Sequence, residues 1–184
     1  MLKETWQVVL AGEGGQGLIV AGILMAEAAS IFEGKLATQT QSYGIATRGG
    51  FSKAEVIISN KEIVYPGVEK PDLVLALSEE AYEKYARSLG RDTVLIYDEG
   101  LVDVSKYEKS LANTYGIPFT DAARELGRVG VANIISLGAI TRLTDAVKTD
   151  SMEKAIAKRF SGSAAELNKI AYRCGIKMAE RLKQ

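Results

Sequence analysis

Four glycines and a glutamine follow a short apolar run near the start of the chain. The segment reads Val8-Val9-Leu10-Ala11-Gly12-Glu13-Gly14-Gly15-Gln16-Gly17, and an apolar-rich stretch with helical spacing follows it. We expect a strand, a tight turn and a helix N-terminus. Glycines permit unusual backbone angles and close approach, and the free amides that open a helix favour an anion such as phosphate. Gly14, Gly15 and Gln16 are therefore candidate ligand contacts.

A second polar, glycine-containing loop follows the next expected strand. It reads Ser42-Tyr43-Gly44-Ile45-Ala46-Thr47-Arg48-Gly49-Gly50. Arg48 is a fixed cation whose donor fork suits carboxylate or phosphate, although a solvated loop arginine is the simpler interpretation. In a parallel sheet the loops after the first two strands lie at the same edge, so we expect one shared surface. Its candidate binding residues in this loop are Ser42, Tyr43, Gly44, Thr47, Arg48 and Gly49.

The first loop also matches a dinucleotide-binding pattern. Gly12, Gly14 and Gly17 satisfy G-x-G-x-x-G between a strand and a helix. An NAD site would also need an acidic residue at the end of the second strand, but residues 37–41 contain no carboxylate and Glu33 lies before that strand. A general role in close packing or phosphate contact is therefore favoured over NAD binding. A purely structural strand-to-helix crossing remains an alternative.

The composition excludes several classes of site. The chain of 184 residues has no histidine, one cysteine (Cys174) and equal numbers of acidic and basic residues. Histidine-based catalysis, histidine metal ligands, a disulfide framework, a zinc knuckle and an iron–sulfur site are thereby excluded. Zero net charge gives no reason to expect nucleic acid or a membrane surface as a partner. We expect no catalytic residue, no metal ligand, no signal peptide or membrane span, and a cytoplasmic location.

The remaining patterns alternate strands with helices. We expect strands at residues 6–11, 35–40, 51–59, 62–65, 73–77, 93–97 and 117–119, and helices at 17–32, 79–88, 120–126, 131–143, 151–160 and 164–182. The first helix has an apolar face formed by Ile19, Ile23, Leu24, Ala28 and Ile31. These patterns predict one α/β, Rossmann-like domain over residues 1–184. Its mostly parallel sheet would be flanked by helices, with 51–65 as an appended β-hairpin.

Taken together, the motifs resemble the gamma subunit of 2-oxoacid:ferredoxin oxidoreductases. The motifs are the glycine turn, the loop with Tyr43-Gly44 and Arg48-Gly49-Gly50, Pro71-Asp72 before an apolar strand, Asn133 with Leu137-Gly138-Ala139, and Asn168 with Gly175. They follow the family's order over nearly the whole chain. One departure is that no glutamate precedes Arg48, where the family often has one, so no carboxylate role is carried over to that loop.

The resemblance implies an accessory subunit of an enzyme that converts a 2-oxoacid and coenzyme A to acyl-CoA and carbon dioxide while reducing ferredoxin. The expected substrate is 2-oxoglutarate or pyruvate. Thiamine diphosphate, magnesium and iron–sulfur clusters are expected on the partners, namely alpha and beta subunits with or without a ferredoxin-like delta subunit. The isolated chain is expected to be inactive. Because the family's equivalent domain is linked to coenzyme A, the two loops are expected to contact it.

Two other classes of function remain open at the level of sequence. One is an independent Rossmann-type nucleotide-binding protein, and the other is an interaction module without a ligand. Nucleotide binding by the isolated chain would favour the first, and activity that appears only with partner subunits would favour the oxidoreductase.

Overall fold

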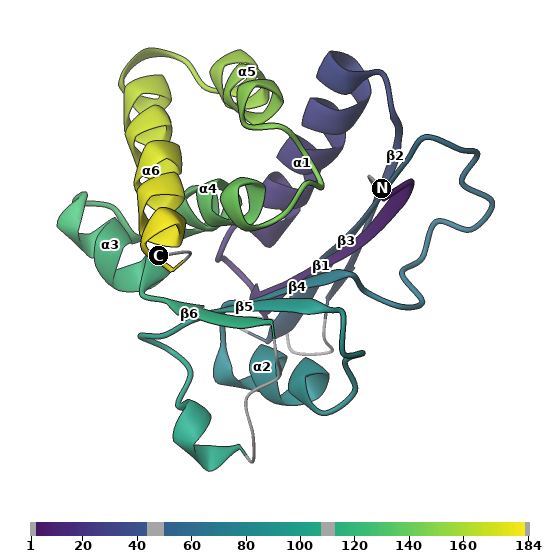
Figure 1. Ribbon diagram of the computed structural model, residues 1–184. Helices are drawn as coiled ribbons and strands as arrows, with labels where there is room; N and C mark the ends of the chain where they lie inside the picture. Colours follow the sequence, from purple (N-terminus) through teal and green to yellow (C-terminus); the bar gives the residue numbers. More distant parts are fainter. Residues whose placement is uncertain (1–2, 44–49, 108–112, 183–184) are drawn as a thin grey trace.

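The computed structural model describes residues 3–43, 50–107 and 113–182, which contain one six-stranded sheet (Figure 1). The strand order is β2-β3-β1-β4-β5-β6. The strands are β1 (Thr5–Glu13), β2 (Leu36–Tyr43), β3 (Phe51–Ser59), β4 (Leu73–Ala76), β5 (Val94–Asp98) and β6 (Thr114–Ile117). β3 pairs antiparallel with both β1 and β2, whereas β1, β4, β5 and β6 pair in parallel, so β3 alone runs against the others.

Helices cover both faces of this sheet. They are α1 (Leu18–Glu33), α2 (Glu79–Ala86), α3 (Phe119–Glu125), α4 (Ala132–Leu143), α5 (Thr149–Arg159) and α6 (Gly162–Arg181), with short 3-10 turns η1 (Val104–Lys106) and η2 (Val129–Val131). Figure 1 shows α1, α4, α5 and α6 on one side of the sheet and α2 on the other. The predicted α/β class, with a mostly parallel sheet between helices, is confirmed. None of the helices in the described ranges is long and apolar enough to cross a membrane.

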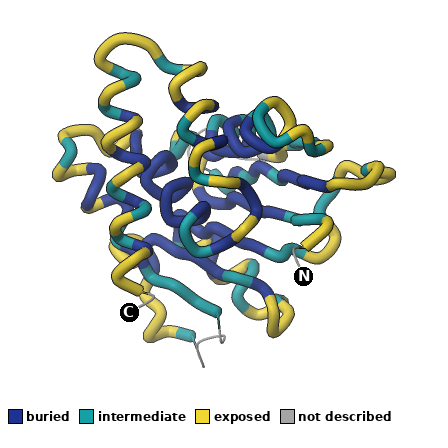
Figure 2. Tube along the Cα trace, turned by 45° about the horizontal axis from the view of Figure 1, so that its top comes forward, coloured by how far each residue is buried: buried dark blue, intermediate teal, exposed yellow. Residues whose placement is uncertain are grey.

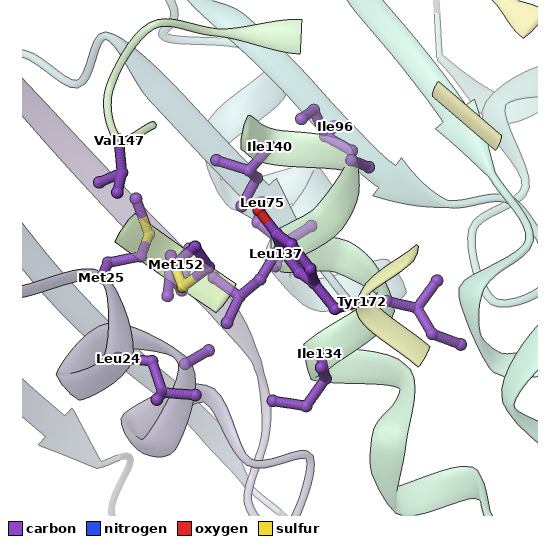
Figure 3. Close-up of a cluster of buried hydrophobic side chains, with 14 of the residues drawn as sticks. Leu24, Met25, Leu75, Ile96, Ile134, Leu137, Ile140, Val147, Met152 and Tyr172 are labelled. Carbon is purple, nitrogen blue, oxygen red and sulfur yellow. The ribbon is translucent and has the colours of Figure 1, made fainter. Parts of the chain in front are cut away.

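The core lies mainly between the sheet and the larger helical layer. β4 is buried along its whole length and β1 from Val8 to Gly12, and Figure 2 shows buried segments in dark blue through the middle of the molecule. Leu75 and Ile96 of the sheet meet residues such as Leu24, Leu137 and Tyr172 from three helices in one apolar cluster (Figure 3). A smaller cluster beneath α2 covers the opposite face of β1, β4 and β5. Burial of both faces explains why Val8–Ala11 and Leu73–Ala76 read as continuous apolar runs.

The predicted appended hairpin is wrong. β3 forms as expected, but residues 62–65 form no strand, and β3 instead lies inside the sheet between β2 and β1. Its register extends over nine pairs with β1, from Thr5↔Ser59 to Glu13↔Phe51. The reason is burial, because Ala54, Val56 and Ile58 on one face of β3 are core residues that an exposed hairpin would leave in water.

The predicted apolar face of α1 is partly wrong as well. Leu24 and Ala28 are fully buried, but Ile31 is 51% exposed, and the helix contacts the sheet through its small residues. A Cβ at Gly22 would lie 3.1 Å from the Ala54 Cβ, so backbone and strand approach closely there. The buried stripe consists of Leu18, Ala21, Gly22, Leu24, Met25, Ala28 and Ala29, and Ile31 lies outside it.

Two glycines set the spacing of α4 and α6. A Cβ at Gly138 would overlap the Tyr172 carbonyl oxygen, and one at Gly175 would overlap that of Ile135. The Gly138 Cβ would also lie 3.1 Å from the Gly175 Cα. The two residues therefore face each other at a crossing where backbone meets backbone.

Candidate functional site

The ends of β1 and β2 bring the two predicted loops to the same edge of the sheet. Tyr43 of β2 pairs with Ser52 of β3, which pairs with Gly12 of β1. Two residues further on, the Gly14 N–H donates to the Gly50 carbonyl at 2.9 Å. The described ends of both loops are thus joined by backbone. Gly44, Thr47, Arg48 and Gly49 lie outside the described residues, so their part in the site stays a prediction.

Gln16 fixes the shape of the glycine turn with both ends of its amide. Its Oε1 accepts from the Glu13 N–H at 2.7 Å, and its Nε2 donates to the Leu77 carbonyl at 2.7 Å. Leu77 follows β4, and its own N–H donates to the Ala11 carbonyl at 2.8 Å. The side chain therefore links the turn after β1 to the segment after β4. We expected Gln16 to contact a ligand, but within the chain its amide is already paired at both ends.

Gly12 and Gly17 make room for side chains of the same molecule. A Cβ at Gly12 would lie closer than 3.0 Å to the Gln16 Oε1, and a Cβ at Gly17 equally close to the Asn133 Nδ2. That Asn133 Nδ2 donates to the Gly17 carbonyl at 2.9 Å, from the first turn of α4. Two of the three pattern glycines are thus explained by internal packing.

Gly15 differs from the other glycines of the turn. Its φ is 99°, a left-handed value that favours glycine, and a Cβ there would meet nothing within 4 Å. Its N–H donates to no described residue, whereas those of Glu13, Gly14 and Gln16 are all bonded. The turn therefore leaves the Gly15 amide open, next to the first amides of α1, which no side chain caps.

A cation and an aromatic ring flank this edge on the α2 side. The Lys84 Nζ lies 4.0 Å from the centroid of the Phe51 ring, which is at the start of β3 beside Glu13. Ser42 is exposed, and of Tyr43 only the backbone is described. Next along the edge, Glu79 accepts from the Asp103 N–H at 2.9 Å and from Lys106, and these bonds lower the pKa of its carboxyl.

The residue that an NAD site would need is absent from the described edge. β2 ends in Thr40-Gln41-Ser42-Tyr43, and Glu33 belongs to the opposite end of the sheet. There its Oε1 accepts from the Lys148 N–H at 2.7 Å and its Oε2 pairs with Lys35 at 2.8 Å. Glu33 therefore serves a structural contact between α1 and α5, which disfavours the dinucleotide interpretation.

At the level of sequence, Asn133 was named only as part of a family motif, and no contact was predicted for it. Asn133 is the single side-chain amide in the apolar stretch that forms α4. A lone amide in such a stretch was the one feature of the sequence that could have indicated a buried hydrogen bond. The partner of Asn133, Gly17, lies 116 positions away in the sequence, so the contact could not be read from local patterns.

Three hollows of the described surface lie away from the glycine turn. One of about 430 Å³ lies between α5 and α6, and one of about 460 Å³ is lined by Trp6, Glu33 and Lys148. The third, also about 460 Å³, surrounds η1. None includes residues 12–17 in its lining, and the exposure of Glu13, Gly14 and Gly15 places the candidate site on an open surface.

Comparison with known proteins decides the family. Residues 7–178 match the model of the family described as pyruvate ferredoxin/flavodoxin oxidoreductase. The chain belongs to this family. The predicted resemblance to its gamma-type subunits is confirmed by the KorC subunit of 2-oxoglutarate synthase from Methanocaldococcus jannaschii, which is 44% identical over 98% of this chain and 97% of its own length.

Solved oxidoreductase structures share the fold. The gamma subunit of a keto/oxoacid ferredoxin oxidoreductase from Geobacter sulfurreducens superposes with a TM-score of 0.82 at 41% identity, covering 96% of this chain and 99% of that one. A 2-oxoglutarate:ferredoxin oxidoreductase from Magnetococcus marinus gives a TM-score of 0.85 at 22% identity, covering 97% of this chain but 32% of that one. The second match shows the same oxidoreductase fold within a longer polypeptide.

Proposed function

We propose that this chain is the gamma subunit of a 2-oxoglutarate:ferredoxin oxidoreductase. The observation that carries the proposal is the 44% identity to a KorC subunit over almost the whole of both chains. Membership in the oxidoreductase family makes the chain one subunit of a multi-subunit enzyme. The narrower choice of 2-oxoglutarate over pyruvate rests on the name of that relative. We also propose that residues 1–184 form a single domain and that the complex is cytoplasmic.

The described residues do not fit the redox and thiamine cofactors of such an enzyme. Within the ranges that the structure covers, no three Asp, Glu, His or Cys side chains come together as metal ligands. Cys174 is half-buried on α6, where burial raises the pKa of its thiol. We therefore place thiamine diphosphate, magnesium and iron–sulfur clusters on the alpha and beta partners and on any ferredoxin-like delta subunit. Ferredoxin is the proposed acceptor of the whole complex.

The end of the sheet at which β1 and β2 terminate is the proposed contact surface for coenzyme A and for the catalytic subunits. Gly15 supplies an open amide and an unobstructed approach, and Arg48 would supply a charged donor fork. Ser42, Tyr43, Gly44, Thr47 and Gly49 complete the proposed contact set with Gly14 and Gln16. Gly14 and Gln16 contribute by shaping the turn, since the Gly14 N–H and one N–H of the Gln16 side chain are bonded within the chain. An open edge of this kind is completed when a partner surface covers it.

Reconstitution of the complex tests this function. The alpha and beta subunits would be purified with and without this chain and assayed for ferredoxin reduction with coenzyme A and either 2-oxoglutarate or pyruvate. We expect turnover that depends on this chain and is faster with 2-oxoglutarate. Equal activity without the chain would refute the subunit role, and a preference for pyruvate would refute the substrate assignment alone.

A further inference from the structure

The glycine turn lies where the sheet changes its winding direction. After β1 the chain crosses one face of the sheet through α1, and after β4 it crosses the other face through α2. Ligands of open α/β sheets bind in the crevice that such a switch creates at the carboxyl ends of the strands. Here the Gln16 side chain spans that crevice, from the Glu13 N–H to the Leu77 carbonyl.

We propose that Gln16 and Asn133 are positioning residues that hold the turn so that the Gly15 amide faces outward. The proposal rests on the function given above, because the ligand presented to Gly15 is the phosphate-bearing coenzyme A. Gln16 fixes the residues before Gly15, and Asn133 fixes Gly17 after it. The pattern glycines at positions 12 and 17 are needed because these two amides occupy the space beside them. Two glycines of the motif are therefore explained from within the chain, and the Gly15 amide stays free for a ligand beside the uncapped start of α1.

The presence of an amide at position 133 is not explained by a contribution to the stability of the fold. The side chain is buried, with 5% of its surface exposed, and its Oδ1 has no partner among the described residues. An unpaired buried acceptor destabilises a fold. The Gly17 carbonyl that it contacts already accepts from the Ala21 N–H at 3.0 Å. Replacing Asn133 by leucine would thus remove an orphaned acceptor without leaving the Gly17 carbonyl unpaired.

The test combines Asn133→Leu with Gln16→Met, a replacement of similar length that makes neither hydrogen bond. In the full chain, amide exchange followed by NMR should show faster exchange at Glu13 in Gln16→Met, while the melting temperature of Asn133→Leu stays level or rises. In the reconstituted complex both variants should raise KM for coenzyme A about 5- to 10-fold, with kcat within about 2-fold of the parent. Gln39→Met is the matched control, since the Gln39 side chain donates to the carbonyl of the adjacent Thr40 and lies away from the glycine turn.

A conservative variant separates positioning from packing. Gln16→Glu keeps an acceptor for the Glu13 N–H but opposes a carboxylate to the Leu77 carbonyl. KM for coenzyme A should therefore fall as pH is lowered and the carboxyl becomes a donor, whereas KM of Gln16→Met should not respond in this way. An unchanged rate of amide exchange at Glu13 in Gln16→Met would show that the Gln16 side chain does not hold the turn, and would overturn the proposal. Altered exchange at Glu13 with an unchanged KM for coenzyme A would show that Gln16 holds the turn but would refute contact between coenzyme A and this edge.

Discussion

Gly15 and Gln16 are neighbours whose polar groups serve different purposes. The Gln16 amide is consumed by the fold, whereas the Gly15 N–H has no partner among described residues. A glycine with φ of 99° and open space above it is the position where a ligand meets least obstruction. The binding chemistry of the turn therefore lies in its backbone, at Gly15 and at the uncapped start of α1.

Substitution of Arg48 tests the charged half of the proposed site. Arg48→Ala in the assembled enzyme should raise KM for coenzyme A or weaken subunit association about 10-fold or more, because one charge-assisted contact is worth roughly 1.5–3 kcal/mol. Steady-state kinetics and gel filtration separate the two effects. Arg159→Ala, an exposed arginine at the end of α5, is the control. If neither quantity changes, Arg48 is a solvated side chain and its assignment is wrong.

Substitution of Gly15 tests the backbone half. Gly15→Val should impair coenzyme A binding more than Arg48→Ala, since a β-branched residue resists a left-handed φ and covers the open amide. Gly15→Ala carries the same backbone strain with less steric cover. Isothermal calorimetry on the assembled enzyme would measure both. Equal affinity for Gly15→Val and the parent would contradict a ligand contact at Gly15.

At the scale of elements, the crossing of α4 and α6 depends on glycine at two positions. Gly175→Ala should lower the free energy of unfolding by about 1–3 kcal/mol or more, because the added methyl group meets the Ile135 backbone and neither helix can yield locally. Urea denaturation measures the change. Gly90→Ala is the control, because a Cβ there meets nothing closer than 3.6 Å. Equal losses in the two variants would contradict the close crossing.

A buried tyrosine at the same crossing predicts that the fold loses stability at alkaline pH. Tyr172 is fully buried, its hydroxyl lies 2.8 Å from the Thr141 Oγ1, and burial raises its pKa to about 12. The folded state therefore keeps this proton above pH 10, where the unfolded state loses it, so stability falls as pH rises between about 10 and 12. In Tyr172→Phe we expect that slope to be shallower by up to about 1.4 kcal/mol per pH unit.

Unfolding of Tyr172→Phe and the parent would be compared by urea denaturation from pH 8 to 12. At pH 8 the variant should be the less stable by about 1 kcal/mol, because it loses the hydrogen bond to Thr141. Parallel curves above pH 10 would show that Tyr172 does not contribute to the alkaline loss.

Local signals were read correctly from the sequence and long-range ones were not. The helix expected at 79–88 forms as α2, and the hydroxyl of Ser78 caps it by accepting from the Ala81 N–H at 3.2 Å, three residues away. The partner of β3 was missed because the Gln7↔Ile57 register joins segments 50 residues apart, which no turn signal reveals. The edge shared by the two loops could be predicted from strand direction. The internal use of Gln16 and Asn133 could not, because it depends on distant Leu77 and Gly17.

For the whole molecule, the distribution of chemistry implies dependence on partners. The purified chain with thiamine diphosphate, magnesium, coenzyme A and 2-oxoglutarate should reduce no ferredoxin, because it has no histidine and one cysteine. It should also show no heat of binding with NAD, since the described end of β2 has no carboxylate. Adding the alpha and beta subunits is the positive control. Ferredoxin reduction by the chain alone would overturn the accessory role, and NAD binding would revive the independent nucleotide-binding interpretation.

The position of β1 in the sheet has a consequence for biosynthesis. Both neighbours of β1, namely β3 and β4, come later in the chain, and the α1 and β2 segments are made before either of them. Val8–Ala11 must therefore leave the ribosome as an apolar segment with both edges unpaired. Its pairing with β3 is complete only after residue 59 has been made. Such a strand is exposed to misassociation while it waits. Newly made chains should consequently need chaperone protection most while synthesis passes from residue 13 to residue 59.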